Sequence, residues 1–112
     1  MEALVTHTGA DLLRLPDRGS LRPGLRADLL VLPAGTALAY ATRANVRMVM
    51  IDGIARYGDA DCAPRASPQG EWANVQVDGV PKMLDLRIAR LLAPARAAET
   101  GLQVAHAAGR AA

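Results

Sequence analysis

The sequence predicts a small α+β fold in which short β-strands are flanked by an N-terminal helix and by C-terminal helices. Three patterns carry this prediction. Residues 28–32 (Asp-Leu-Leu-Val-Leu) form a short, continuously apolar run of the kind found in buried strands. Asp52-Gly53 separates two β-prone runs, which is a strong signal for a two-residue hairpin turn. The third pattern is an apolar stripe at helical spacing, made by Leu84, Ile88, Leu91 and Leu92.

Three parts are expected along the chain. Residues 1–16 contain the N-terminal helix, residues 17–80 contain the strands and the hairpin, and residues 81–112 form a helical extension with a frayed tail. Hydrophobic residues make up 51% of the 112 residues, but aromatic residues only 3%, and phenylalanine is absent. The core must therefore be built from aliphatic side chains and methionine, and a domain of this size buries a modest core.

The N-terminal part predicts a helix followed by a turn. Apolar residues recur about two turns apart within residues 2–15, and Pro16 and Gly19 end the pattern. Pro23-Gly24 suits the two central positions of a type II turn, because proline presets the first and glycine tolerates positive φ at the second. This turn leads into the predicted strand at residues 28–32.

The middle of the chain predicts a hairpin and a loop. Residues 46–51 and 54–57 are the strands on either side of Asp52-Gly53. Residues 60–70 hold two prolines and a glycine and are predicted to form a loop. Residues 72–80 are predicted to be extended and contain a second Asp-Gly pair, Asp78-Gly79.

The C-terminal part predicts helix. Pro81 is expected to open a helix, because its missing N–H is harmless at the first helical position. The apolar stripe predicts that residues 84–92 form a helix packed on the strands. Pro94 is expected to end or kink it, residues 95–106 to add an alanine-rich turn or two, and residues 107–112 to fray.

Charge and composition exclude several classes of protein. The 13 basic and 11 acidic residues give a net charge of +2, without a basic block that would indicate a nucleic-acid partner. No stretch approaches the roughly 18 apolar residues of a membrane span, and residues 1–15 lack the pattern of a signal peptide. Cys62 is the single cysteine, so an internal disulfide is excluded. We expect a cytoplasmic protein.

Two further segments carry a family resemblance. Residues 19–32 (GSLRPGLRADLLVL) resemble the amidohydrolase pattern G-x-[LI]-x-x-G-x-x-A-D-[LI]-[VL]-[VL]-[LD], which in that family follows the last helix of the catalytic barrel. Residues 46–59 (VRMVMIDGIARYGD) resemble the strand, I-D-G turn and return strand that the family places next. The likeness covers residues 2–59, and residues 77–85 (VDGVPKMLD) are similar to a C-terminal extension of some members that act on ring or amidine C–N bonds.

The resemblance implies the C-terminal segment of a metal-dependent amidohydrolase, with the deaminase and chlorohydrolase-like branch one option. Its fold would be a partial β-sandwich without the catalytic TIM barrel. In this setting Asp28 is expected to cap a turn or to accept backbone N–H bonds, and Asp52-Gly53 to set the hairpin register. The partner would be the missing barrel or another protein chain, and unpaired strand edges would favour self-association.

The chemistry that the resemblance implies belongs elsewhere. Family members hydrolyse non-peptide C–N bonds with a hydroxide bound to zinc or another divalent metal, held by a His-x-His pair, further histidines and an aspartate. This sequence has no His-x-His, and it is expected to begin beyond the last ligand. We therefore expect no catalytic, cofactor-binding or metal-binding residue in this chain, and no activity of the chain alone.

Polar residues were weighed for another site and are better explained by structure. His7 and His106 are far apart in sequence, and Cys62 lies beside Asp59 and Asp61, whose charges disfavour a thiolate and which lack a fourth metal ligand. The remaining candidates are expected to have structural roles: Lys82 and Asp85 as first-turn helix charges, Trp72 in packing, Asp52 and Asp78 in turns, and Gly19, Gly24 and Gly35 outside any phosphate loop.

Three functional hypotheses remain. The chain is the C-terminal part of an amidohydrolase, or a free-standing binding or assembly module derived from its sandwich domain, or a small enzyme with an unrelated site. A helix that covers the strands would favour the module, whereas an uncovered apolar face and open strand edges would favour the first hypothesis.

Overall fold

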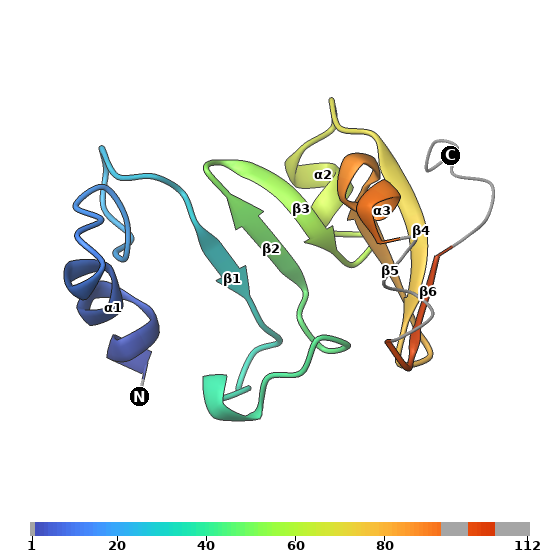
Figure 1. The fold of residues 1–112 in the computed structure, drawn as a ribbon, viewed down its shortest axis with the longest axis horizontal. Helices are drawn as coiled ribbons and strands as arrows, with labels where there is room; N and C mark the ends of the chain where they lie inside the picture. Colours follow the sequence, from blue (N-terminus) through green and yellow to red (C-terminus); the bar gives the residue numbers. More distant parts are fainter. Residues whose placement is uncertain (1, 93–98, 105–112) are drawn as a thin grey trace.

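The computed structural model describes residues 2–92 and 99–104, and these residues form an α+β fold with one six-stranded antiparallel sheet (Figure 1). The strand order is β1-β2-β3-β5-β4-β6. The strands are β1 (Leu29–Val31), β2 (Met48–Ile51), β3 (Ile54–Gly58), β4 (Trp72–Val77), β5 (Val80–Asp85) and β6 (Leu102–Val104). The helical elements are η1 (Glu2–Val5), α1 (His7–Leu12), η2 (Leu38–Tyr40), α2 (Ala63–Ala66) and α3 (Leu86–Leu91). The predicted fold class is confirmed at this level.

Both Asp-Gly pairs form tight hairpin turns. Asp52 and Gly53 have φ values of 51° and 79°, and they join β2 to β3 as predicted. Asp78 and Gly79 have φ values of 51° and 82°, and they join β4 to β5. Two consecutive residues with positive φ match the right-handed twist of the flanking strands, which is why this residue pair recurs in hairpins.

The prediction that a helix begins at Pro81 is wrong. Pro81 lies in β5, directly opposite Gln76 of β4, and the helix α3 begins only at Leu86. Asp85 caps it, because its carboxylate accepts a hydrogen bond from the Arg87 N–H at 2.8 Å. The hairpin set by Asp78-Gly79 thus overrides the helical spacing that included Leu84.

Other element predictions need smaller corrections. The predicted loop at residues 60–70 contains the short helix α2, in which proline occupies the first turn. Residues 102–104 form strand β6 within the stretch predicted as an alanine-rich helix. Pro94 and His106, with the rest of residues 93–98 and 105–112, lie outside the described residues.

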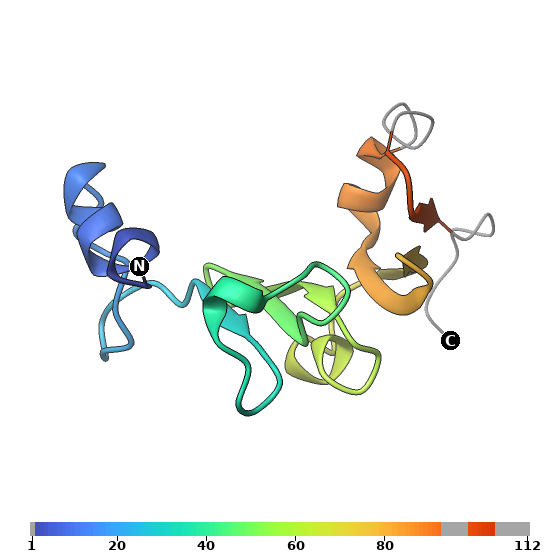
Figure 2. The same cartoon turned by 90° about the horizontal axis from the view of Figure 1, so that it is seen from below.

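The predicted N-terminal helix is split. The Thr6 hydroxyl donates to the Glu2 carbonyl oxygen at 2.8 Å, and Thr6 has a non-helical backbone conformation that separates η1 from α1. Arg14 has a φ of 57°, and α1 ends just before it. Figures 1 and 2 show this helical segment standing apart from the sheet, joined to β1 by an extended stretch.

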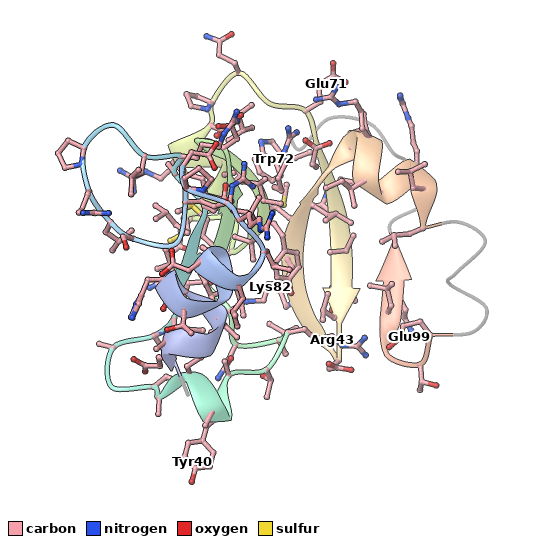
Figure 3. The ribbon with its side chains drawn as sticks, turned by 60° about the vertical axis from the view of Figure 1, so that its left-hand side comes forward. Tyr40, Arg43, Glu71, Trp72, Lys82 and Glu99 are labelled. Atoms are coloured by element: carbon pink, nitrogen blue, oxygen red, sulfur yellow. The ribbon has the colours of Figure 1, made fainter. Side chains whose placement is uncertain are left out.

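The core lies on both faces of the β4–β5 hairpin. Successive residues of β4 point to opposite faces, so its two sets of buried side chains pack separately. One cluster lies under α3 and consists of Ala73, Val75, Val77, Leu84, Leu86 and Ala89. The other includes α2 and consists of Ala55, Ala63, Trp72 and Met83. Trp72 is therefore a packing residue, as predicted, and Figure 3 shows it in the interior with Lys82.

Helix α3 packs on the strands as predicted, over a shorter length. Leu86 and Ala89 are buried, Ile88 and Leu92 pack against the same cluster, and Leu91 is 76% exposed. No helix of the described ranges is long and apolar enough to cross a membrane.

Candidate functional site

Lys82 of β5 is the one buried charged residue of the described part of the chain. Its side chain is 2% exposed. The Nζ atom donates to the Val46 carbonyl oxygen at 2.8 Å and to Asp59 Oδ1 at 2.5 Å. A buried ammonium group is tolerated only when its charge is compensated and its N–H groups are hydrogen-bonded. Lys82 therefore joins β5 to the segments that precede β2 and follow β3.

The contacts of Asp59 extend into a larger group, the Lys82 cluster, which consists of Lys82, Asp59, Arg47 and Asp61. Arg47 Nε donates to Asp59 Oδ2 at 3.1 Å, and Arg47 Nη2 donates to Asp61 Oδ2 at 2.9 Å. Hydrogen bonds from Arg47 to Asp61 are the largest cause of a raised Arg47 pKa. Two cations thus face two carboxylates, and the cluster carries no net charge.

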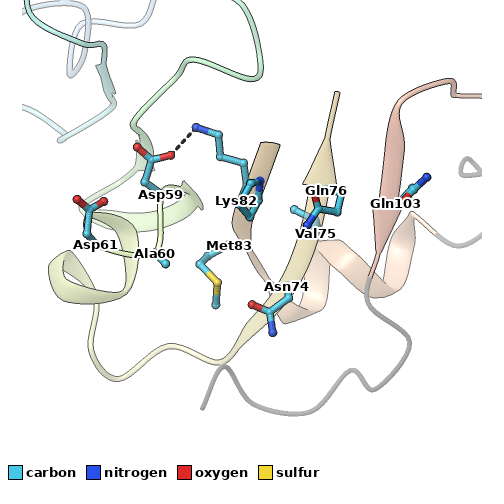
Figure 4. Close-up of a pocket in the computed structure, with 10 residues that line it drawn as sticks. Asp59, Ala60, Asp61, Asn74, Val75, Gln76, Lys82, Met83 and Gln103 are labelled. Atoms are coloured by element: carbon cyan, nitrogen blue, oxygen red, sulfur yellow. Dashed lines mark hydrogen bonds and ion pairs between the residues drawn. The ribbon is translucent and has the colours of Figure 1, made fainter. Parts of the chain in front are cut away.

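A surface groove of about 620 Å³ lies beside this cluster (Figure 4). Residues of the segment after β3 form one wall, and β4, β5 and β6 form the other. The carboxamides of Asn74, Gln76 and Gln103 supply hydrogen-bond donors and acceptors on the strand side. The charged side chains of the groove already have partners within the chain. The groups that remain able to bind a ligand are therefore neutral carboxamides.

A second charged group, the Arg43 cluster, consists of Arg43, Asp78, Glu99 and Thr100. Arg43 donates to both carboxylate oxygens of Asp78, at 2.8 and 2.9 Å. It also donates to Glu99 Oε1 at 2.5 Å and to the Thr100 carbonyl oxygen at 2.7 Å. These bonds tie the loop before β2 to the β4–β5 turn and to the segment that enters β6.

Electrostatics in the Arg43 cluster follow from these contacts. Hydrogen bonds from Arg43 are the main cause of a lowered Asp78 pKa, and bonds from Asp78 and Glu99 raise the pKa of Arg43. Tyr57 donates its hydroxyl proton to the Arg43 carbonyl oxygen at 2.5 Å. Burial, followed by the charge of Asp59, raises the pKa of Tyr57 to about 12. Tyr57 therefore stays neutral and acts as a hydrogen-bond donor.

The segment that resembles the amidohydrolase pattern forms a third group of contacts. Asp28 Oδ1 accepts a hydrogen bond from the Asp52 N–H at 2.7 Å, as predicted for Asp28. The Gly53 N–H donates to the Ala27 carbonyl oxygen at 2.9 Å. Arg26 pairs with both Asp17 and Asp52. The Ala-Asp element and the Asp-Gly turn, which are 24 residues apart, thus form one structural unit.

The structure separates the remaining candidate residues. His7 is exposed at the start of α1, and Cys62 is partly buried just before α2. Asp59 and Asp61 come together, but with Arg47 and Lys82 rather than with Cys62 as ligands. The prediction that Lys82 is a first-turn helix charge is wrong, since it lies within β5, whereas Asp85, the last residue of β5, caps the first turn of α3.

A metal does not fit these residues. Over residues 2–92 and 99–104, no three or more His, Cys, Asp or Glu side chains are grouped so that they could hold a metal ion. The carboxylates of the Lys82 cluster accept hydrogen bonds from a lysine and an arginine, and those cations would repel a divalent ion. We derive no metal-dependent step from this chain.

Sequence reasoning missed the Lys82 cluster, and one signal could have found it. Asp78-Gly79 lies between two runs that fit strands, so the rule that predicted the first hairpin also places Lys82 in a strand. Arg43 and Arg47 gave no such signal, because their partners lie 12 to 57 residues away in the sequence.

Comparison with protein-family models, with curated proteins and with solved structures gives no match to this chain.

Proposed function

We propose that this chain is the C-terminal, non-catalytic part of a cytoplasmic amidohydrolase-family hydrolase that acts on non-peptide C–N bonds. The observation that supports this most is the bond between the Asp28 carboxylate and the Asp52 N–H at 2.7 Å. It links the two sequence elements on which the resemblance rests. In this proposal both elements are structural, and they hold the strand and hairpin that stand beside a catalytic barrel.

Exposed apolar side chains on the N-terminal segment support this proposal. Apolar side chains there are exposed to an unusual degree: Val5 67%, Leu12 75%, Leu13 73% and Leu21 83%. Large exposed apolar surfaces are typical of contact sites, so these side chains are candidates for one. A barrel that packed on α1 would cover them, and the partial β-sandwich would be completed by strands from the same partner beside the edge strand β1.

The charged clusters support a scaffold rather than a catalyst. Lys82 and Asp59 neutralise each other, and Arg47 engages the free oxygen of Asp59 together with Asp61. Hydrolysis at a C–N bond would use a hydroxide activated by a metal that the barrel holds. This chain would support the barrel and take no direct part in that step.

The coding DNA upstream of Met1 tests the proposal first. It is expected to contain an open frame with a His-x-His pair. The encoded segment, expressed with this chain, should co-purify with it, and Leu12→Asp together with Leu13→Asp should abolish the association. Arg65→Asp, a single-site charge change on the distant helix α2, serves as the control and should leave it intact. Association that survives the leucine changes contradicts the proposed surface.

A free-standing assembly module is the second candidate, and one observation favours it. Helix α3 covers β4 and β5 with buried Leu86 and Ala89, so part of the sheet is covered by the chain itself. A cooperative unfolding transition of a monomeric chain would support the module over the first proposal. Metal-dependent hydrolysis of an amide or an aminated ring by the purified 112-residue chain would contradict both.

A further inference from the structure

Strand β4 has an edge that would pair with another chain if it were left open. Its six residues, Trp-Ala-Asn-Val-Gln-Val, contain no charge, no proline and no glycine. Uncharged β-prone segments of this length pair readily with a second chain when their edge is free. In this fold β5 occupies one side of β4, and the three-residue strand β6 occupies the other along residues 75–77.

The Arg43 cluster holds β6 in this position. Arg43 bonds Glu99 and the Thr100 carbonyl oxygen, just before β6 begins, and binds Asp78 in the turn that ends β4. The Asp78 N–H also donates to the Gly101 carbonyl oxygen at 2.7 Å. Arg43 itself is held by Tyr57 of β3. Ion pairs and hydrogen bonds of Arg43, in addition to the backbone pairing with β4, thus hold the three-residue strand β6 in place.

Gly101 is part of the same attachment. Its φ is +85°, and a Cβ atom there would overlap Asp78 Oδ1 and crowd Arg43 Nη2. A side chain at this position would have to displace the Asp78 carboxylate that Arg43 binds, and the positive φ also favours glycine. The sequence is therefore adapted at this position to let residues 99–104 lie against the β4–β5 turn.

We propose that residues 99–104 are an intramolecular cover that prevents β4 from pairing with β4 of a second copy of this chain, and that Arg43 keeps the cover closed. Release of β6 exposes the β4 edge. Two such edges can pair in antiparallel orientation about a two-fold axis, and each copy then satisfies the other's backbone groups. The inference does not depend on the proposed function.

The test is hydrogen exchange of the full chain, measured at low and at high protein concentration. Arg43→Gln should speed exchange of those amides of residues 75–77 that face β6 about three- to tenfold at low concentration, because the closed state loses its charged hydrogen bonds. Protection should return at high concentration, when β4 edges pair. Arg26→Gln is the matched control: its side chain is 45% exposed against 42% for Arg43, and each arginine binds two carboxylates.

Gly101→Ala provides a second variant that keeps every charge. It should give the same concentration-dependent exchange as Arg43→Gln. Gly35→Ala is its control, because Gly35 has nearly the same φ of +82° with no atom within 4 Å of an added Cβ. This pair separates displacement of the Arg43 cluster from the general strain of alanine at positive φ.

Two outcomes overturn the inference. Unchanged exchange of the amides of residues 75–77 that face β6, in both Arg43→Gln and Gly101→Ala, would show that the Arg43 cluster does not hold the cover. Faster exchange that is the same at every concentration would show that a second copy does not occupy the exposed edge. Exchange that is fast only at low concentration, in both variants and in neither control, supports it.

Discussion

The two Asp-Gly hairpins have nearly identical turns and very different surroundings. Asp52-Gly53 and Asp78-Gly79 share the same positive φ values to within 3°. The β4–β5 hairpin pairs over six residues, and its buried side chains pack under α3 on one face and beside α2 on the other. The β2–β3 hairpin has a register shift between Val49 and Met50, and most of its side chains are partly or fully exposed. Turn chemistry therefore determines where a hairpin forms, and coverage of its faces determines where the core lies.

This difference gives the two hairpins separate roles. The β4–β5 hairpin contributes most of the buried side chains in the two core clusters, because one face packs under α3 and the other buries Trp72 and Met83 beside α2. The β2–β3 hairpin contributes Ala55 to the cluster around Trp72, and it is also held by polar bonds to the preceding segment, such as the one between Asp28 and Asp52. Its neighbour β1 is a three-residue edge strand, with Leu30 48% exposed. The N-terminal half of the described chain is thus the half with more of its apolar side chains exposed.

The largest difference is expected from truncating an apolar side chain in each hairpin. Trp72→Ala in β4 should lower the free energy of unfolding by about 3–5 kcal/mol, because it leaves a cavity between Ala55, Ala63 and Met83. Ile51→Ala in β2 should lower it by less than about 1 kcal/mol, since that side chain is 49% exposed. Urea unfolding measures both. Equal losses would contradict the assignment of the core to the second hairpin.

Breaking the contact between the hairpins should have the next largest effect. Asp59→Asn leaves the Lys82 ammonium buried without its counter-charge and should lower the free energy of unfolding by about 2–3 kcal/mol. Lys82→Met removes the buried charge, so the double variant should be more stable than Asp59→Asn alone. A double-mutant cycle by urea unfolding measures the coupling. Additive effects would show that Lys82 and Asp59 do not act as a pair.

Alanine substitutions at the turn glycines should destabilise the two hairpins by the same amount. Gly53→Ala and Gly79→Ala each place a side chain at a φ near +80° with open space around it. Each should lower the free energy of unfolding by about 1 kcal/mol, the strain of a non-glycine residue in this region. Thermal or urea unfolding checks the equality. A much larger loss at Gly79 would indicate that its turn contributes contacts beyond the backbone conformation.

The smallest expected effect is the loss of stability in acid that is due to Asp85, at the end of the β4–β5 hairpin. Burial alone would raise the pKa of Asp85, but hydrogen bonds from Arg56 and from the Arg87 N–H lower it below the ordinary value. As pH falls through the ordinary aspartate range, the unfolded chain takes up a proton that the folded chain does not, so stability decreases. Asp85→Asn should lose less stability than wild type between about pH 5 and pH 3. Parallel acid titrations of unfolding would contradict this if the two slopes coincide.

Sequence patterns predicted the local features and missed the long-range ones. The Asp52-Gly53 turn and the strand predicted at residues 28–32, observed at Leu29–Val31, follow from turn chemistry and a short apolar run. Pro81 misled because its preference for a first helical turn is weaker than pairing with β4, which the sequence around Asp78-Gly79 already indicated. Asp78-Gly79 indicated that Lys82 lies in a strand, but its partner could not be predicted, because Lys82 and Asp59 are 23 residues apart and meet only when β3 pairs with β5.

Hydrogen exchange across a series of urea concentrations tests most directly the claim that the second hairpin is the stable core. Amides of residues 72–77 and 80–85 should include those that exchange only through global unfolding. Amides of residues 29–31 and 48–51 should open at a lower free energy, by about 1–2 kcal/mol or more. Equal opening free energies in the two hairpins, or a more protected first hairpin, would contradict the claim that the β4–β5 hairpin is the stable core.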